Sequence, residues 1–153
     1  MSEIKYLQQL IDEKLKQVNF PQHPENLYDP VRYMLSIGGK RIRPLLVLMS
    51  CELFNGDIKK AIHPALAVEV FHNFTLLHDD IMDKAPVRRN KATVHEKWNA
   101  NIAILSGDAM FVKAIQLLTI TDESKIPALT GVFTATSLEV CEGQQYDMDF
   151  EGR

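Results

Sequence analysis

The segment from Lys59 to Met82 limits the possible folds more than any other part of this sequence. It has the period of one long helix, and its run Ala65–Val70 is apolar on most faces. A helix that is apolar around most of its circumference must be enclosed by other elements of the same protein. We therefore expect this helix to be central, with the rest of the chain packed around it.

The flanking segments also follow the helical repeat, and no convincing strand alternation is present. An apolar stripe recurs from Ile4 to Val18, and Pro21 ends it. Gly38-Gly39 is a plausible left-handed cap for a second helix, which we expect near Pro30–Ile37. Further helices are expected over residues 45–54, from 94 or 101 to 118, and over 126–149 with a weak break at 131, and a polar loop over 85–93. This pattern predicts an all-α bundle, with residues 1–153 forming a single helical domain.

Composition narrows the possible partners and location. The net charge of −3 argues against a general nucleic-acid binder, whose footprint would be basic. Cys51 and Cys141 lack a metal-type spacing, so we expect reduced, buried thiols in a cytoplasmic protein. The N-terminus lacks the apolar core of a secretory signal, and no run approaches the length of a membrane span. We therefore expect a soluble protein without a transmembrane segment.

The central helix ends in Asp-Asp-Ile-Met-Asp, which places three carboxylates at positions 79, 80 and 83. On a helix, Asp79 and Asp83 lie one turn apart, with Cβ atoms about 5–6 Å from each other. Such carboxylates repel, and Mg²⁺ removes the repulsion while completing its shell with substrate phosphates. Arg88 and Arg89 follow, and a guanidinium grips phosphate bidentately. The segment predicts a site for metal and diphosphate; the simpler alternatives are a solvated acidic helix end and a surface ion pair between Arg88 and Asp83.

Two further segments contain candidate site residues. Glycine-rich Gly38–Pro44 carries Lys40 and Arg43 three residues apart, and amides near a helix start favour anions. Its alternative reading is a charged loop capped by glycines. Gln144 and Asp147 share one face of the last helix, which is equally typical of an ordinary polar helix surface. The histidines lack the spacing of a helical zinc site.

These elements occur together and in order. They are Gly-Gly-Lys-Arg-Ile-Arg-Pro, Phe-His-Asn-Phe-Thr-Leu-Leu-His-Asp-Asp-Ile-Met-Asp, Arg-Arg with Thr93 and His95, and Gly-Gln-Gln-Tyr-Asp. The combination resembles the trans-isoprenyl diphosphate synthase (polyprenyl synthetase) family from about residue 25 to the end. The resemblance implies a helical bundle around a deep cavity, and it implies Mg²⁺ as the cofactor.

The resemblance also assigns roles to residues. Asp79 and Asp83 would bind the metal directly, with Asp80 in support and Asp147, paired with Gln144, lining the cavity near the metals. Arg88 would hold an allylic diphosphate, such as the dimethylallyl, geranyl or farnesyl compound. The isopentenyl diphosphate would be held by Lys40, Arg43, His72 and Arg89. Gly39 and Gln144 are further expected substrate-binding residues. Catalysis would depend above all on Asp79, Asp83, Arg88 and Lys40.

The reaction implied by the resemblance is a head-to-tail condensation. The carbon–oxygen bond of the allylic diphosphate ionises, while metal and guanidinium charge stabilise the departing diphosphate. The isopentenyl double bond attacks the carbocation, and the released diphosphate takes the proton. The carbocation must be kept from water in a dry apolar pocket. No protein nucleophile is needed, in agreement with the absence of a Ser-His or Cys-His arrangement.

Members of this family use the residues four and five before the first aspartate to limit product length. Here these are Thr75 and Phe74, so we expect a short C15–C20 product, with geranylgeranyl diphosphate favoured. Members of the family carry a second aspartate-rich motif and are about twice as long as this chain. No second Asp-Asp-x-x-Asp motif follows Asp83 here. We therefore expect an N-terminal half, which is inactive alone, derived from an enzyme that is a homo-oligomer.

Three other readings stay open at this point. A terpene cyclase shares the ionisation chemistry, but it has no use for an isopentenyl site. A metal-dependent phosphohydrolase of the His-Asp type is suggested by His78-Asp79, yet His63 and His72 are poor partners for it. The third reading is a non-catalytic helical subunit that only binds a partner.

Overall fold

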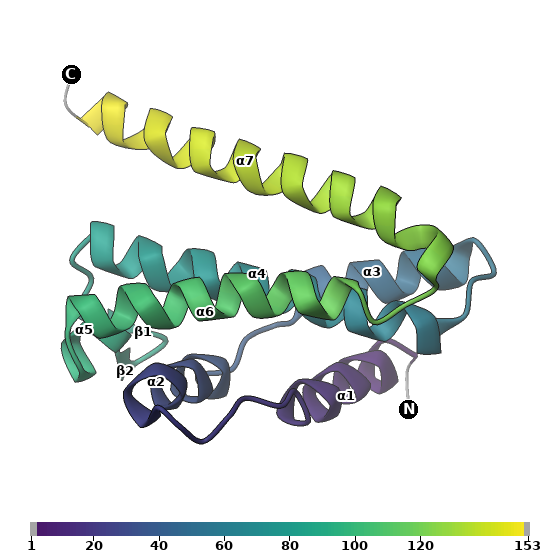
Figure 1. Cartoon of the computed structure of the whole chain (residues 1–153), viewed down its shortest axis with the longest axis horizontal. Helices are drawn as coiled ribbons and strands as arrows, with labels where there is room; N and C mark the ends of the chain where they lie inside the picture. Colours follow the sequence, from purple (N-terminus) through teal and green to yellow (C-terminus); the bar gives the residue numbers. More distant parts are fainter. Residues whose placement is uncertain (1–2, 152–153) are drawn as a thin grey trace.

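The central helix expected from the sequence is α4 (Ile58–Met82) in the computed structural model of the chain. The structure describes residues 3–151, with side chains up to residue 150. α6 (Ala100–Leu118) runs beside α4 and makes its most extensive contact with it, while α3 (Ile42–Leu53) and α1 (Glu3–Lys16) pack on other sides (Figure 1). The all-α fold around an enclosed helix is confirmed.

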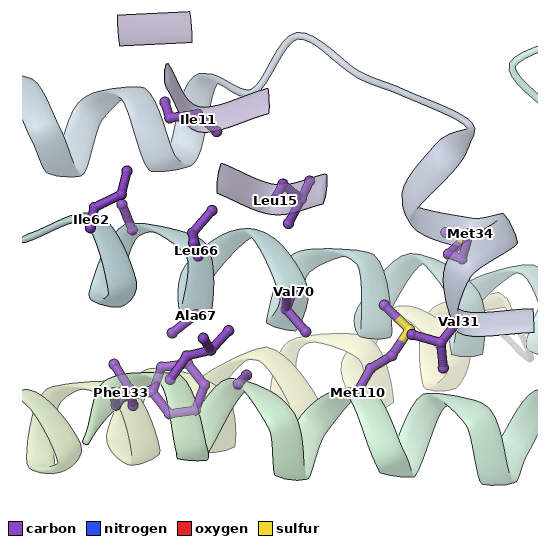
Figure 2. Close-up of a cluster of buried hydrophobic side chains, with 14 of the residues drawn as sticks. Ile11, Leu15, Val31, Met34, Ile62, Leu66, Ala67, Val70, Met110 and Phe133 are labelled. Carbon is purple, nitrogen blue, oxygen red and sulfur yellow. The ribbon is translucent and has the colours of Figure 1, made fainter. Parts of the chain in front are cut away.

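The hydrophobic core joins these helices through side chains of α4. Figure 2 shows Ile62, Leu66 and Val70 of α4 beneath side chains of α1 and opposite side chains of α6 and α7 (Ile126–Glu151). Ala65 and Ala67 are fully buried, and their small side chains allow neighbouring helices to pack close to α4. The buried cluster also includes Ile11 and Leu15 of α1, Val31 and Met34 of α2, Met110 of α6, and Phe133 of α7.

Two segments differ from the sequence expectation. α2 (Glu25–Ser36) begins before Pro30, because Pro24 at its N-cap already has extended backbone and its carbonyl accepts from the amides of Leu27 and Tyr28. Pro30 then lies inside the helix, where it is buried. The segment expected as a polar loop contains a small hairpin of β1 (Val87–Arg88) and β2 (Lys91–Ala92). Arg89 and Asn90 have positive φ, the conformation that a tight two-residue hairpin turn needs.

From residue 94 to residue 151 the chain is helical with two interruptions, one before α6 and one before α7. α5 (Val94–Lys97) is separated from α6 by Asn99, whose side chain accepts from the Ile102 amide and caps α6. A short 3₁₀ turn, η1 (Glu123–Lys125), leads into α7, which runs without a break through Gly131. In Figure 1, α7 diverges from α4 and α6 toward its C-terminal end.

The structure corrects one expectation about the thiols and adds a finding about α6. Both cysteines are free, but Cys141 is exposed on α7 and Cys51 is only half-buried, so the expectation of two buried thiols was wrong. By length and composition, α6 alone among the described helices could cross a membrane, which the sequence analysis overlooked. This is weak evidence, because core helices meet the same test, and the packing of α6 on α4 accounts for its apolar residues.

Candidate functional site

The acidic corner of the site forms where α4 ends. Asp80 is buried, and Nε of Arg88 donates to both of its carboxylate oxygens at 2.9 Å. Nη2 of the same arginine lies 3.4 Å from Oδ2 of Asp79. Arg88 is brought there by β1, immediately after the turn that ends α4. The ion pair therefore involves Asp80 and Asp79, whereas the sequence analysis had considered Asp83.

The charges around Asp79 favour a cation. Burial raises the pKa of Asp79 above its usual range, and Asp83 raises it further. Arg88 opposes these effects, while Asp80 and Asp147 of α7 add smaller contributions in the same direction as Asp83. Asp147 is therefore near enough to act electrostatically on the end of α4.

The residues present fit a metal ion that takes few ligands from the protein. Among residues 3–151, no three His, Cys, Asp or Glu side chains are grouped so as to hold a metal ion by themselves. Mg²⁺ commonly needs one or two carboxylates and takes its other ligands from water and substrate phosphate. Of the four expected aspartates, Asp80 is committed to Arg88, whereas Asp79 is half-buried and Asp83 and Asp147 are exposed.

Next to this corner is a basic pocket of about 460 Å³. It is lined by all four residues that the resemblance gave to isopentenyl diphosphate, by the expected substrate-binding Gly39, and by three neighbours. The lining residues are Gly39, Lys40, Arg41, Ile42, Arg43, Glu69, His72 and Arg89. These residues come from the loop before α3 and the first turn of α3, from α4, and from the hairpin turn. The tertiary structure therefore brings together three segments that are distant in sequence.

The backbone of Gly39 lies close to the guanidinium of Arg89, which would have to shift if residue 39 carried a side chain. A Cβ atom at this position would lie 2.7 Å from Nη1 of Arg89, closer than such atoms approach one another. Gly38, with φ of +86°, ends the second helix in the left-handed conformation that the sequence predicted. The two glycines thus have different functions: one turns the chain and the other admits a guanidinium group.

His72 reports the electrostatics of the pocket. Burial lowers the pKa of His72, and Arg43 lowers it further; Glu69 opposes them, and Arg89 and Arg88 contribute in the lowering direction. Nη1 of Arg43 lies 3.3 Å from Nε2 of His72. Arginine can only donate, so Nε2 accepts and the imidazole is neutral in this arrangement. The one acidic residue of the lining, Glu69, is paired with the buried Arg41. Lys40, Arg43 and Arg89 are exposed cations, so the pocket suits an anion.

A second pocket of about 450 Å³ adjoins the first, since Arg43 and His72 line both. Asp79 and Gln144 supply its polar side, and Thr75 faces the same space. Its apolar wall consists of Val68, Phe71, Leu76 and Val140. Two adjoining pockets, one basic and one with an apolar wall, therefore meet beside Asp79.

Phe74, which the sequence predicted would narrow the product pocket beside Thr75, does not line the second pocket. Its ring packs against Phe111 with centroids 5.3 Å apart and against His78 at 4.7 Å. Phe71, whose centroid is 5.6 Å from that of Phe74, is the phenylalanine that lines the second pocket. The ring of Phe133 from α7 meets Phe71 edge-on at 5.1 Å.

One residue of the basic pocket was missed by the sequence analysis. Arg41 is buried, and its guanidinium donates to Glu69 and to Asp12. A signal for it was present, because Glu69 is an acidic residue inside the apolar run of the central helix. A buried carboxylate needs a charged or hydrogen-bonding partner.

Comparison with known proteins identifies the family. The family model described as polyprenyl synthetase matches residues 24–153. The chain belongs to the polyprenyl synthetase family. The resemblance stated from the sequence motifs is thereby confirmed.

Relatives in this family match almost the whole chain. Geranylgeranyl pyrophosphate synthase of Geoglobus acetivorans is 42% identical over 152 residues, covering 98% of this chain and 48% of its own length. Geranylgeranyl diphosphate synthase of Methanosarcina mazei is 39% identical and covers 100% of this chain and 48% of its own length. The chain thus spans about half the length of the curated relatives it matches.

Solved structures of polyprenyl synthetases have the same arrangement of helices. A crystal structure of a geranylgeranyl pyrophosphate synthase is 54% identical, with a TM-score of 0.96, and the match covers 100% of this chain and 47% of that one. The enzyme of Pyrococcus horikoshii is 42% identical with a TM-score of 0.92, covering 99% of this chain and 47% of that one. This chain therefore has the helical architecture of about half of an isoprenoid synthase.

Proposed function

We propose that this chain is the N-terminal half of a trans-isoprenyl diphosphate synthase, which condenses isopentenyl diphosphate with an allylic diphosphate. One observation carries the proposal: the basic pocket and the apolar-walled pocket adjoin at Arg43 and His72, beside Asp79. A condensation of two diphosphates needs two such chambers that open onto each other. The relatives named as geranylgeranyl diphosphate synthases support the same reaction.

In this proposal the basic pocket holds the isopentenyl diphosphate. Lys40, Arg43 and Arg89 supply positive charge, and the Gly39 backbone lies against Arg89. Burial is the main cause of the lowered pKa of His72, and the positive charges of Arg43, Arg89 and Arg88 lower it further. A diphosphate group in the pocket would supply negative charge.

The second pocket would hold the allylic substrate. Its tail would lie along Phe71 and Val140, where few polar groups could trap a carbocation. Asp79 and Asp83 would hold Mg²⁺, which when bound neutralises the charge that develops on the departing diphosphate. Arg88, held by Asp80, would add a guanidinium beside the same group.

The carbon–oxygen bond of the allylic substrate breaks, and a carbon–carbon bond to the isopentenyl double bond forms. The proton lost from the isopentenyl carbon goes to the released diphosphate, so no side chain must act as nucleophile. A terpene cyclase would have no need of the basic pocket, and a His-Asp phosphohydrolase would need histidine ligands. Within the described residues, no group with three such ligands occurs.

We further propose a C15–C20 product, a soluble cytoplasmic enzyme and a homo-oligomeric parent. Thr75 supports the product range, because this small side chain faces the second pocket one turn below Asp79. Support for assembly comes from apolar side chains on outward faces, including Leu105 and Val112 of α6, which are 60% and 55% exposed. Such surfaces are commonly covered by another chain or by another part of the same protein.

The test of this proposal begins with the chain itself. Isothermal titration calorimetry of the purified 153-residue chain with isopentenyl diphosphate should give saturable binding that needs no Mg²⁺. Replacing Lys40 and Arg43 with alanine should abolish the binding, since both line the basic pocket. The matched control replaces Lys59 and Lys60 with alanine. These two exposed lysines lie at the N-terminal end of α4, far along the helix from Asp79. Equal binding by the two double variants would contradict the proposal.

A second measurement tests the reaction. The full-length synthase that contains this chain should incorporate labelled isopentenyl diphosphate into an allylic acceptor and release diphosphate when Mg²⁺ is present. Release of inorganic phosphate without a longer prenyl product would instead favour the phosphohydrolase.

A further inference from the structure

A network of charged side chains forms part of the wall of the basic pocket and extends from it to α1. Its centre is Arg41, which is only 6% exposed, although Lys40 before it and Arg43 after it are both exposed. Nη1 of Arg41 donates to Oε1 of Glu69 at 2.6 Å, and Nε donates to Oδ1 of Asp12 at 3.1 Å. Nη2 donates to the carbonyl of Leu35 at 3.1 Å. Each nitrogen of the guanidinium therefore already has a protein acceptor.

Glu69 is held just as firmly on the other side of this contact. Its side chain is 4% exposed, and Nδ2 of Asn73 donates to Oε1 at 3.1 Å. The same Nδ2 lies 2.8 Å from the backbone carbonyl of Glu69. An ion pair at this depth has low tolerance for the loss of one partner, because a buried charge would then be left alone.

The backbone at Arg41 has a conformation that needs support. Its φ of +50° lies in the left-handed region, which residues with a Cβ atom rarely adopt. Arg41 is also the N-cap of α3, so this backbone turn determines where the helix that carries Arg43 begins. Lys40 precedes the turn, and its carbonyl accepts from Nε2 of Gln8 at 3.4 Å. The network thus fixes the turn that places Lys40 and Arg43 around one pocket.

We propose that Arg41 is a positioning residue for the isopentenyl diphosphate site, fixed by Asp12 of α1 and Glu69 of α4. It holds the left-handed turn that brings Lys40 and Arg43 to the same pocket, while its own guanidinium remains bound to Glu69. The inference rests on the proposed function, since that function supplies the ligand. It extends the site to α1, a helix that lines neither the basic pocket nor the adjoining pocket.

The test uses one pair of matched variants and one conservative variant. Asp12→Asn weakens the Arg41 pair at a carboxylate that is 51% exposed, so folding should persist. Asp29→Asn is the matched control, because it removes the charge from the ion pair between Asp29 and Arg32. The Asp29 carboxylate is 52% exposed, and neither residue lines the basic pocket. Arg41→Lys keeps the charge and removes the planar fork that joins the two acids.

Two measurements on these variants separate this inference from the proposed function. In calorimetry, Asp12→Asn and Arg41→Lys should weaken isopentenyl diphosphate binding roughly tenfold, while Asp29→Asn changes it less than about twofold. In the full-length enzyme, KM for isopentenyl diphosphate should rise while KM for the allylic substrate and kcat stay nearly constant. Equal effects on both substrates, or equal effects of Asp12→Asn and Asp29→Asn, would overturn the inference.

Hydrogen–deuterium exchange provides a readout that needs no ligand. Amides over residues 38–43 should exchange faster in Asp12→Asn and Arg41→Lys than in the wild type or in Asp29→Asn. If the wild-type chain does not bind isopentenyl diphosphate, the proposed function fails. Unchanged exchange in both network variants would instead show that Arg41 does not order the loop.

Discussion

Arg88 and Asp80 are joined by a charge-assisted contact in which Nε lies 2.9 Å from each carboxylate oxygen. Asp80 is buried, so this contact replaces the hydration that its carboxylate gave up. As a consequence, the three aspartates at the end of α4 have different roles. Asp80 holds the hairpin arginine in place, which leaves Asp79 and Asp83 as the carboxylates that remain for a metal ion.

Asp79→Ala in the full-length synthase should lower turnover by roughly three orders of magnitude, because a metal ligand for the leaving diphosphate is lost. The measurement is incorporation of labelled isopentenyl diphosphate at saturating Mg²⁺. Glu13→Ala, which removes an exposed carboxylate from α1, serves as the control and should leave turnover unchanged. Near-normal turnover in Asp79→Ala would rule out the assigned role.

Product length should respond more to Phe71 than to Phe74. Phe71→Ala should lengthen the product, because this ring forms part of the wall of the second pocket. Phe74→Ala should also lengthen it, but less, since Phe74 acts by supporting the ring of Phe71 at 5.6 Å. Thr75→Phe should shorten the product by filling the pocket. Chromatography of the prenyl products of the full-length variants distinguishes these effects, and an unchanged distribution in all three would place the limit elsewhere.

The stability of the chain should fall as the pH drops below about 6.5, the ordinary pKa of histidine. Burial and Arg43 lower the pKa of His72, so the unfolded chain takes up a proton on this group before the folded chain does. The loss should begin at the ordinary value and level off below the lowered one. Thermal unfolding followed by circular dichroism between pH 8 and pH 5 measures it. His72→Gln should show a smaller loss, and an equal loss would assign the effect to other groups.

Two glycine-to-alanine changes should have opposite effects on stability. At Gly107 of α6 an added methyl would meet Nε2 and Cδ2 of His78 from α4, and overpacking of this kind costs about 1–3 kcal/mol. At Gly131 of α7 the added Cβ would meet nothing within 4 Å apart from neighbouring residues of its own helix, and alanine should stabilise the helix by about 0.5–1 kcal/mol. Urea unfolding of the purified chain measures both. A Gly107 variant as stable as the wild type would contradict the close packing of α4 on α6.

The chain alone should be inactive and should associate with other copies. The outward face of α3 carries a stripe of exposed apolar residues at helical spacing, namely Ile42, Leu46, Met49 and Leu53. Water is an unfavourable environment for such a continuous surface. Light scattering should therefore detect association, and Leu46→Glu with Leu53→Glu should reduce it. A monomeric chain at high concentration, or prenyl transfer by the purified 153-residue chain alone, would contradict the prediction.

The sequence predicted the features that depend on local pattern. Helical period identified α4, and the spacing of Asp79 and Asp83 placed both at its end. The partners of these residues could not be found this way, because they depend on which segments meet in space. Arg88 turned out to pair with Asp80, and Arg41 with an acid from α1 and another from α4. The direction of Phe74 was missed for a related reason, since the packing of α6 determines which face of α4 looks into the pocket.

The geometry of α7 gives its far end the properties of a lever. Phe133 and Ser137 are its buried residues within the described part of the helix, and both lie in its first half. From Phe133 to Asp147 the helix rises about 21 Å, so a tilt of about 10° at the first moves the second by about 4 Å. That displacement exceeds the tolerance of a metal–oxygen bond many times over. The position of Asp147 relative to Asp79 is therefore determined by whatever packs along the outer turns of α7, and a small change in that packing could open or close the acidic corner.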